Sequence, residues 1–203
     1  MKIIAIGRNY VNHAKELNNE VPQKPVFFMK PETALLQKNN PFYYPEFSKN
    51  IHYEAEIVIK INKIGKYIDE QFAHRYYSEI GIGIDFTARD LQQEQKEKGL
   101  PWEIAKAFDH SAPISTFVNL SDYQDIQKIN FSLDINGKRV QTGNTQDMLF
   151  SVDKIIAYVS QFVSLKIGDL IFTGTPSGVG KIKIGDKLEA AIEGQTLLNF
   201  EIK

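Results

Sequence analysis

The chain of 203 residues contains no cysteine, which excludes disulfide bonds and thiolate metal ligands. Neither sign of charge dominates, since 24 Lys and Arg stand against 25 Asp and Glu. This balance lacks both the basic excess typical of nucleic-acid binding and the acidic run of a disordered tail. The N-terminal apolar run, residues 1–7, is too short to span a membrane and lacks a small-residue cleavage site. We therefore expect a cytoplasmic protein without a nucleic-acid or membrane partner.

A hydrophobic content of 42% is enough for a sizeable core, and no repeat or linker divides the chain. We expect a single domain over residues 1–203. Helical patterns cover residues 9–18, with Asn9 as N-cap, and residues 69–78, 87–98 and 151–165. Strand patterns cover residues 2–6, 25–30, 52–59, 131–135, 169–173, 187–192 and 197–202, with a hairpin turn at Asn136-Gly137. The sequence therefore predicts a β-rich α+β fold, without the regular alternation of a doubly wound sheet.

Three carboxylates are the most informative pattern that the sequence contains. Glu54 and Glu56 are two apart in a predicted strand, so their side chains share one face, and Asp85 ends a second apolar run. Three carboxylates at one point repel each other unless a positive charge lies between them. All-oxygen ligands favour a hard cation such as Mg²⁺, Mn²⁺ or Ca²⁺. The alternative is a solvated strand face, which is the commoner origin of alternating charge.

His13 and Glu16 are three apart on the first predicted helix and share a face. A carboxylate beside a histidine can fix its tautomer and orientation, so the pair could act as a general base. The alternative is an ordinary surface pair, and the two residues alone favour that interpretation.

Polar residues follow Asp85 along the chain: Arg89 one turn later, Gln92 a further turn on, and Lys106 after a loop. Cations beside a metal would suit an anionic substrate. The alternative for Arg89 is a structural ion pair with Asp90.

The glycine-rich loop over residues 174–181 invites a phosphate-binding interpretation, but its spacing does not fit a P-loop. Gly174 precedes Gly180 by six positions, and Lys181 is followed by Ile182. Small residues there would instead let the backbone pass close to a ligand, or form a tight structural turn.

Taken together, these segments resemble the fumarylacetoacetate hydrolase family. The matching stretches are residues 52–56, 85–90, 106–109, 136–137 with Gln141, and 168–180, in the order found in the family. The motif Gly7-Arg8-Asn9-Tyr10, which leads to His13 and Glu16, is similar to the acylpyruvase subgroup, which includes oxaloacetate decarboxylases and tautomerases. Ala105 and the Pro113-Ile114-Ser115 stretch depart from the usual family pattern near the substrate pocket, which leaves specificity open.

The resemblance implies the family's mixed β-sandwich or β-roll with short flanking helices, and a homodimer. It implies Mg²⁺ or Mn²⁺, with Ca²⁺ as a possible occupant in a crystal, on Glu54, Glu56 and Asp85. It implies a catalytic dyad of His13 and Glu16 on a lid segment within residues 1–20. The remaining implied site residues are catalytic Lys106 and the substrate-binding Arg89, Gln92 and Thr175.

The implied activity is metal-dependent hydrolysis of a C–C bond in acylpyruvates such as acetylpyruvate or fumarylpyruvate, decarboxylation of oxaloacetate, or both. One alternative is an isomerase or tautomerase of 2-oxoacids or ring-cleavage products of the 2-hydroxyhepta-2,4-diene-1,7-dioate type. The His13–Glu16 pair favours hydrolysis or decarboxylation over that isomerase. A second alternative is a non-catalytic homologue that binds small acids.

Overall fold

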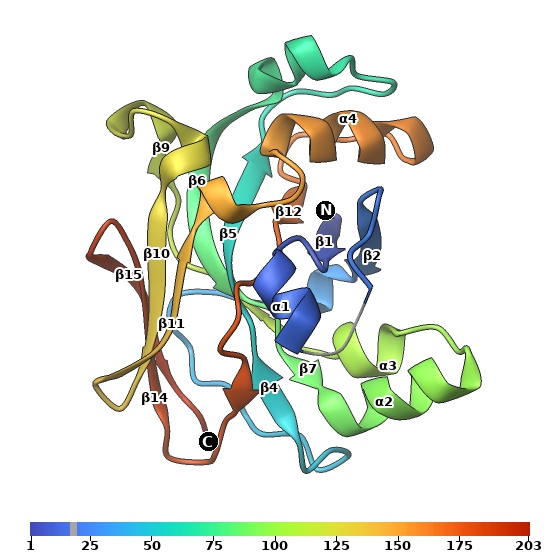
Figure 1. Ribbon diagram of the computed structural model, residues 1–203. Helices are drawn as coiled ribbons and strands as arrows, with labels where there is room; N and C mark the ends of the chain where they lie inside the picture. Colours follow the sequence, from blue (N-terminus) through green and yellow to red (C-terminus); the bar gives the residue numbers. More distant parts are fainter. Residues whose placement is uncertain (17–19) are drawn as a thin grey trace.

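A mixed six-stranded sheet forms the centre of the fold (Figure 1). The computed structural model of the chain describes residues 1–16 and 20–203. The strand order is β2 (Val26–Lys30), β1 (Ile3–Gly7), β12 (Leu170–Phe172), β5 (Ala55–Ile61), β6 (Tyr77–Ile84) and β9 (Val118–Asn119). Strands β1 and β12 pair in parallel, and the other neighbours pair antiparallel. The first strand of the chain therefore lies inside the sheet, between the edge strand β2 and β12.

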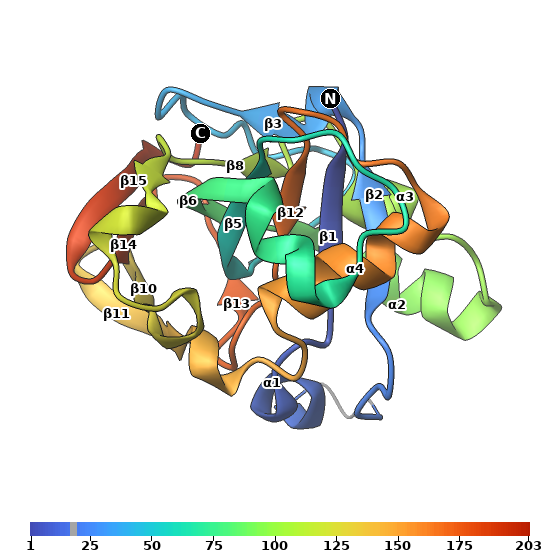
Figure 2. The same ribbon diagram turned by 90° about the horizontal axis from the view of Figure 1, so that it is seen from above.

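A second, antiparallel sheet lies against β5 and β6 (Figure 2). It consists of β11 (Lys138–Asn144), β10 (Asn130–Ile135), β14 (Lys187–Ile192) and β15 (Gln195–Glu201). Smaller pairings join β13 (Gly180–Lys181), β4 (Ile51–Tyr53) and β7 (Thr87–Ala88), and join β3 (Leu35–Leu36) with β8 (Ala112–Pro113). The α-helices are α1 (Val11–Glu16), α2 (Arg89–Lys98), α3 (Glu103–Lys106) and α4 (Val152–Phe162), with 3₁₀ turns at Glu32–Ala34, Glu70–Tyr76, Leu120–Asp122, Ile126–Lys128 and Thr145–Asp147. None of the described helices is long and apolar enough to cross a membrane.

The hydrophobic core lies on both faces of the six-stranded sheet. Side chains alternate along a strand, so Ile57 and Ile59 of β5 enter the large core with α4 and the second sheet. Val58 points to the other face, where it joins a smaller core with Ile3 and Phe172. Glu54 and Glu56 precede Val58 by four and two residues. The predicted strand alternation therefore points their side chains to the same face as Val58, at the end of the smaller core.

Local signals in the sequence explain the best predicted elements. The Ser151 hydroxyl accepts a hydrogen bond from the Lys154 N–H at 3.2 Å and caps α4, and Ile155, Ile156 and Val159 are buried. Asn136 and Gly137 both have positive φ, 53° and 75°, as a type I′ turn requires. The predicted helix over 151–165 and the predicted hairpin are confirmed, although α4 ends at Phe162 because Val163 is extended.

Other predictions need correction. The segment predicted as one strand over residues 52–59 is interrupted at Glu54, between β4 and β5. The predicted helix over 69–78 is a 3₁₀ helix that ends at Tyr76, where β6 follows. The helix expected from residue 87 begins only at Arg89. Of the helix expected over 9–18, α1 covers Val11–Glu16, and residues 17 and 18 lie outside the described residues.

Glycines in β6 make room for an aromatic ring beside the strand. Ile80, Ile82 and Ile84 face the large core, while Gly81 and Gly83 face the other way. A Cβ atom on Gly83 would lie 2.6 Å from Cε1 of Phe172, closer than carbon atoms can approach. The pattern thus lets Phe172 pack directly on the strand that leads to Asp85.

We expect Gly83→Ala to destabilise the protein by about 1–3 kcal/mol, because the added methyl group forces the Phe172 ring to move. Chemical denaturation monitored by circular dichroism would measure the loss. Gly7→Ala is the matched control, since its nearest contact would be an ordinary 3.9 Å and it changes the unfolded chain in the same way. Equal stability of the two variants would contradict the packing argument.

Candidate active site

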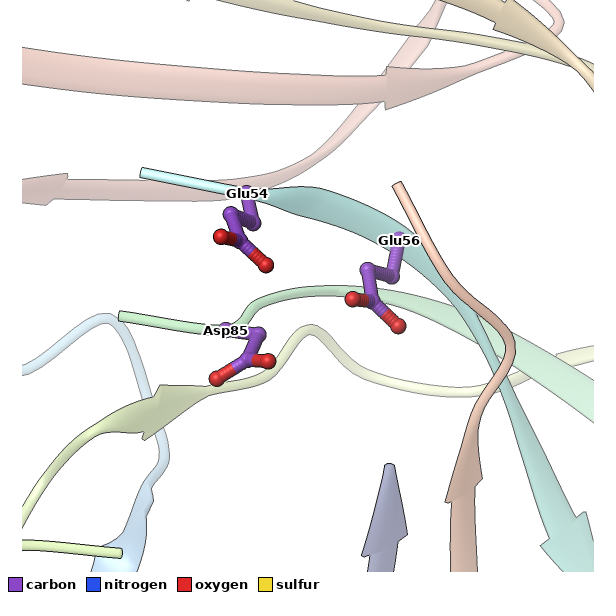
Figure 3. Close-up of side chains that lie close together, drawn as sticks. All are labelled: Glu54, Glu56 and Asp85. Atoms are coloured by element: carbon purple, nitrogen blue, oxygen red, sulfur yellow. The ribbon is translucent and has the colours of Figure 1, made fainter. Parts of the chain in front are cut away.

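The three predicted carboxylates converge in the interior (Figure 3). One ligand oxygen from each of Glu54, Glu56 and Asp85 lies within 4.8 Å of the others, and the residues are 5%, 1% and 1% exposed. The pairing of β5 with β6 creates this arrangement: the Asp85 N–H donates to the Glu54 carbonyl at 2.8 Å, directly beyond the last paired residues. The alternative of a solvated strand face is therefore wrong.

Three cationic side chains surround the carboxylates. The Lys106 ammonium lies 2.9 Å from Glu54 and 2.7 Å from Asp85, at the last residue of α3. Arg89, the first residue of α2, contacts Glu54 at 2.6 Å, and the buried Lys30 ammonium lies 2.7 Å from Asp85.

The alternative ion pair between Arg89 and Asp90 is wrong, because the two side chains have different partners. Asp90 accepts a hydrogen bond from the Ser48 hydroxyl at 2.6 Å, whereas Arg89 reaches Glu54. Consecutive residues on a helix point in different directions, which separates this pair.

The cations act unequally on the carboxylates. Burial alone would raise the pKa of Glu54, but the charges of Lys106 and Arg89 outweigh burial and hold this pKa below its ordinary value. Burial and the neighbouring charges of Asp85 and Glu54 raise the pKa of Glu56 well above the ordinary value. Within the described residues, no Lys or Arg nitrogen lies within 4.0 Å of a Glu56 oxygen. Glu56 is thus the carboxylate whose negative charge is least balanced by nearby cations.

The donor set fits a hard divalent cation. All three groups supply carboxylate oxygens, which Mg²⁺ and Mn²⁺ favour as ligands. A divalent charge between them would relieve the repulsion that raises the pKa of Glu56. Glu56 is also oriented, because one of its oxygens accepts a hydrogen bond from the Gly174 N–H at 2.6 Å.

The structure brings His13 and Glu16 together beside the carboxylates. His13 is 5% exposed, and its Nδ1 lies 3.2 Å from a Glu16 oxygen. The other Glu16 oxygen accepts a hydrogen bond from the Gly178 N–H at 3.0 Å, which links α1 to the glycine-rich loop. The burial of the histidine does not fit the alternative of an ordinary surface pair.

One cavity is lined by most of the predicted site residues. Its lining includes eight of the nine candidate residues: His13, Glu54, Glu56, Asp85, Arg89, Gln92, Lys106 and Thr175. Glu16 lies behind His13 and contacts it. The buried Arg89 Nε has no hydrogen-bond partner among the described residues, while its two other nitrogens bind Gln92 at 2.7 Å and Glu54 at 2.6 Å. A buried donor without a partner is uncommon in a folded protein, and a bound anionic ligand would satisfy it.

Gln141 connects the glycine-rich loop to the carboxylate strand. Its amide nitrogen donates to the Thr175 hydroxyl at 2.9 Å and to the Pro176 carbonyl at 3.0 Å. Its amide oxygen accepts from the N–H of Ala55, the residue between Glu54 and Glu56, at 3.0 Å. In the sequence, Gln141 stands out only through the family resemblance, because its partners come together only in the folded chain.

Asn9 is not the helix cap that its position suggested. Its buried amide nitrogen donates to the carbonyls of Thr173, at 2.8 Å, and Phe150, at 3.1 Å, and its oxygen accepts from the Phe150 N–H at 2.9 Å. The side chain therefore holds the start of α1 against the glycine-rich loop. Gly174 passes close to it with φ of 103°, and a Cβ atom there would lie 2.7 Å from the Asn9 Cβ.

Lys30 is the site residue that sequence reasoning missed. Its ammonium donates to the Ser111 carbonyl at 3.0 Å, to the Ser111 hydroxyl at 2.9 Å and to the Lys106 carbonyl, besides contacting Asp85. Burial lowers its pKa, and the negative charge of Asp85 opposes this effect. The available signal was a lysine that closes the apolar strand of residues 25–29.

We expect Lys30→Met to cost about 3–5 kcal/mol of stability, because it leaves Asp85 buried without this partner. Urea denaturation in the presence of EDTA would measure the cost without a contribution from bound metal. Lys60→Met is the control: its pair with Glu79 is more than a third exposed, so its loss should cost less than about 1 kcal/mol. A Lys30→Met protein as stable as the Lys60→Met protein would contradict the importance of this contact.

The fold and the buried carboxylate trio define a class of β-rich enzymes with a site at the end of a paired strand. The profile of the fumarylacetoacetate (FAA) hydrolase C-terminal region matches residues 2–203, and the chain belongs to this family. The family and fold predicted from the sequence are confirmed, as is the prediction of an enzyme.

Characterised relatives are similar over nearly the whole chain. The mitochondrial oxaloacetate tautomerase FAHD1 of Mus musculus is 42% identical over 201 residues, covering 99% of this chain and 91% of that protein. The mitochondrial oxaloacetate decarboxylase of Dictyostelium discoideum is 43% identical over 203 residues, covering 99% and 93%. The crystal structure of fumarylpyruvate hydrolase from Pseudomonas aeruginosa, in complex with Mn²⁺ and pyruvate, has a TM-score of 0.94 and 36% identity, covering 100% of this chain and 89% of that one.

Proposed function

We propose that this chain is a divalent-cation-dependent enzyme that breaks the C3–C4 bond of a 2-oxoacid, one carbon away from the keto group. The reactions are hydrolysis of acylpyruvates and decarboxylation of oxaloacetate. The observation that carries the proposal is the convergence of Glu54, Glu56 and Asp85 with His13 and Lys106 on one buried cavity. Relatives named for oxaloacetate and fumarylpyruvate chemistry support it.

Glu54, Glu56 and Asp85 would hold Mg²⁺ or Mn²⁺ through their carboxylate oxygens. When bound, such an ion supplies Lewis-acid polarisation of the keto and carboxylate oxygens of a 2-oxoacid. Arg89 and Thr175 bind the substrate from the cavity wall, and the unpaired Arg89 Nε–H offers a donor to its carboxylate.

His13 is the proposed general base for hydrolysis. It removes a proton from a water molecule, whose oxygen adds to the distal carbonyl carbon of the acylpyruvate. Glu16 fixes the orientation of the imidazole, and its second oxygen is itself held by the Gly178 N–H. When the bond between the former carbonyl carbon and the methylene breaks, the electron pair stays on the methylene carbon. That carbon takes up a proton, so the products are a carboxylic acid and pyruvate.

Lys106 is the proposed partner of the charge that develops on the attacked carbonyl oxygen. An ammonium group has three N–H donors, and two contacts of Lys106 go to Glu54 and Asp85. Its third donor can therefore serve the substrate oxygen, and Gln92, which lines the same cavity, can assist it.

The same arrangement accommodates oxaloacetate. Loss of CO₂ requires an electron-withdrawing keto group at the site but no attacking water, so His13 is less important for this reaction. Keto–enol tautomerisation requires still less, namely a base at the carbon next to the keto group and an acid at the keto oxygen. One cavity can therefore support all three reactions with different demands on the dyad.

Removal of the cation tests the proposal directly. We expect EDTA-treated protein to lose activity toward acetylpyruvate, followed by the loss of enol absorbance, and toward oxaloacetate, followed by CO₂ release. Addition of Mg²⁺ or Mn²⁺ should restore both activities. Comparison of the rate with Mg²⁺ and the rate with Mn²⁺, for the same substrate, would identify the better metal. Full activity of the metal-free protein would overturn the assignment.

Several finer assignments belong to the same proposal. They are a homodimer, a cytoplasmic location, a single catalytic domain over residues 1–203, Mg²⁺ as the resident ion, and a lid within residues 1–20. Residues 17–19 of that lid lie outside the described residues.

A further inference from the structure

The cavity has a second group of charged residues besides the carboxylate trio. Arg8, directly after β1, and Lys96, on α2, both line it, together with Trp102 at the start of α3. Neither cation takes part in the proposed chemistry. The Trp102 ring packs edge-on against Phe28, with ring centroids 5.8 Å apart, and the Phe28 ring lies 5.3 Å from the Lys106 ammonium. A Cβ atom on Gly7, the residue before Arg8, would lie 3.9 Å from the Trp102 ring, so an aromatic wall runs from Lys106 to the segment that carries Arg8.

Helix geometry places Lys96 on the same side of α2 as Arg89. Arg89, Gln92 and Lys96 are spaced at i, i+3 and i+7 and lie on one face of α2, where all three line the cavity. Seven residues advance a helix by about 10 Å, and a helical side chain leans back toward the N-terminus. Lys96 therefore lines the same cavity as Arg89 from a position two turns farther along α2.

Arg8 is held in a conformation that is uncommon for its residue type. Its φ is 60°, in the left-handed region of backbone conformation that residues other than Gly, Asn and Asp seldom adopt. Such strain persists where the surrounding structure fixes the backbone, and it is frequent at ligand sites. Here the following residue, Asn9, is anchored to Thr173 and Phe150, which fixes the turn.

The two cations lack a protein counter-charge. Among residues 1–16 and 20–203, no carboxylate oxygen lies within 4.0 Å of a nitrogen of Arg8 or Lys96. Burial and the positive charges of Arg8 and Arg89 lower the pKa of Lys96. Arg89, Lys106 and Lys30 already equal the three carboxylates in number, although their contacts go to Glu54 and Asp85 and not to Glu56. The cavity thus carries excess positive charge even before a divalent cation binds.

We propose that Arg8 and Lys96 form a subsite for the distal carboxylate of the substrate, so that the enzyme selects dicarboxylic 2-oxoacids over monocarboxylic ones. This inference rests on the proposed function, because the 2-oxoacid end must bind at the trio. The distal carboxylate accepts hydrogen bonds from the guanidinium and the ammonium, while the carbon chain lies along the Phe28–Trp102 wall.

Two stable acids of equal chain length test the subsite without turnover. 2-Oxoglutarate and 2-oxopentanoate differ only in the distal carboxylate, and neither is a β-keto acid that the proposed chemistry cleaves. Calorimetric titration of the Mn²⁺-loaded protein should show 2-oxoglutarate binding at least about tenfold more tightly, as expected for hydrogen bonds to a charged group.

Substitution of each cation should abolish most of this preference. Arg8→Asn keeps a residue that tolerates positive φ, and Lys96→Met keeps helix propensity, so both should fold. Lys98→Met is the matched control, because Lys98 lies on the same helix but pairs with Glu94 at the surface, and it should keep the preference.

The outcomes separate the two proposals. Equal affinity for the two acids in the unmodified protein, or an unchanged ratio in Arg8→Asn and Lys96→Met, would overturn the subsite and leave the proposed function intact. If neither acid, nor pyruvate itself, binds the Mn²⁺-loaded protein, the result contradicts the proposed function, and the subsite falls with it.

Discussion

Glu56→Gln should lower kcat/KM for both acetylpyruvate and oxaloacetate by about a thousandfold, or about 4 kcal/mol of transition-state stabilisation. Glutamine keeps the shape of the side chain and an oxygen that can accept the Gly174 N–H. It removes one of the three negative charges that would hold a divalent cation. Because both reactions need the cation, both should fall together, and Mn²⁺ affinity measured by calorimetry should fall with them.

Glu79→Gln is the control for Glu56→Gln. Glu79 lies on β6 in the same sheet and pairs with Lys60 away from the trio, so the substitution changes the net charge equally. We expect it to leave Mn²⁺ affinity and both activities within about twofold of the unmodified protein. Unchanged Mn²⁺ affinity in Glu56→Gln would exclude Glu56 as a ligand.

His13→Asn should separate the two reactions. Loss of a general base typically costs about 10²–10⁴-fold, so we expect a loss of this size in acetylpyruvate hydrolysis. Decarboxylation of oxaloacetate needs no activated water and should fall less than about tenfold. Mn²⁺ affinity should stay the same, since the trio is untouched. Parallel progress curves with the two substrates would measure the split.

His74→Asn provides the matched control, because His74 is exposed on the 3₁₀ helix Glu70–Tyr76 and does not line the cavity. An equal loss of both activities in His13→Asn would assign the histidine to a step common to the two reactions. Undiminished hydrolysis would remove it from the mechanism altogether.

Short-range patterns in the sequence predicted the secondary structure well where the signal is local. The α4 helix has a capping serine and a periodic apolar face, and the Asn136-Gly137 turn requires positive φ. Prediction was weaker at Glu54, where the strand breaks. That break follows from the change of pairing partner, from β13 and β7 on β4 to β12 and β6 on β5, which no local pattern encodes.

The candidate site was predicted mainly through the family resemblance. Alternation alone could not distinguish a buried Glu54 from a solvated one, because burial depends on what covers the strand. Lys30 and Asn9 show the limit most clearly: each acts through partners more than 50 residues away in the sequence. Their residue types suggested a strand end and a helix cap, whereas the tertiary contacts use them as connectors.

The contacts that assemble the cavity join the two ends of the chain. Thr173 is bound by Asn9 across 164 positions, Gly178 by Glu16 across 162, and Gly174 by Glu56 across 118. During synthesis, α1 and β5 therefore cannot form these contacts until the glycine-rich loop has left the ribosome. Non-local contacts of this kind also slow folding, because much of the chain must be closed into a loop first. A nascent chain that stops before residue 174 would contain every proposed cation ligand and His13 but no completed site, so catalytic competence should appear only near the end of translation.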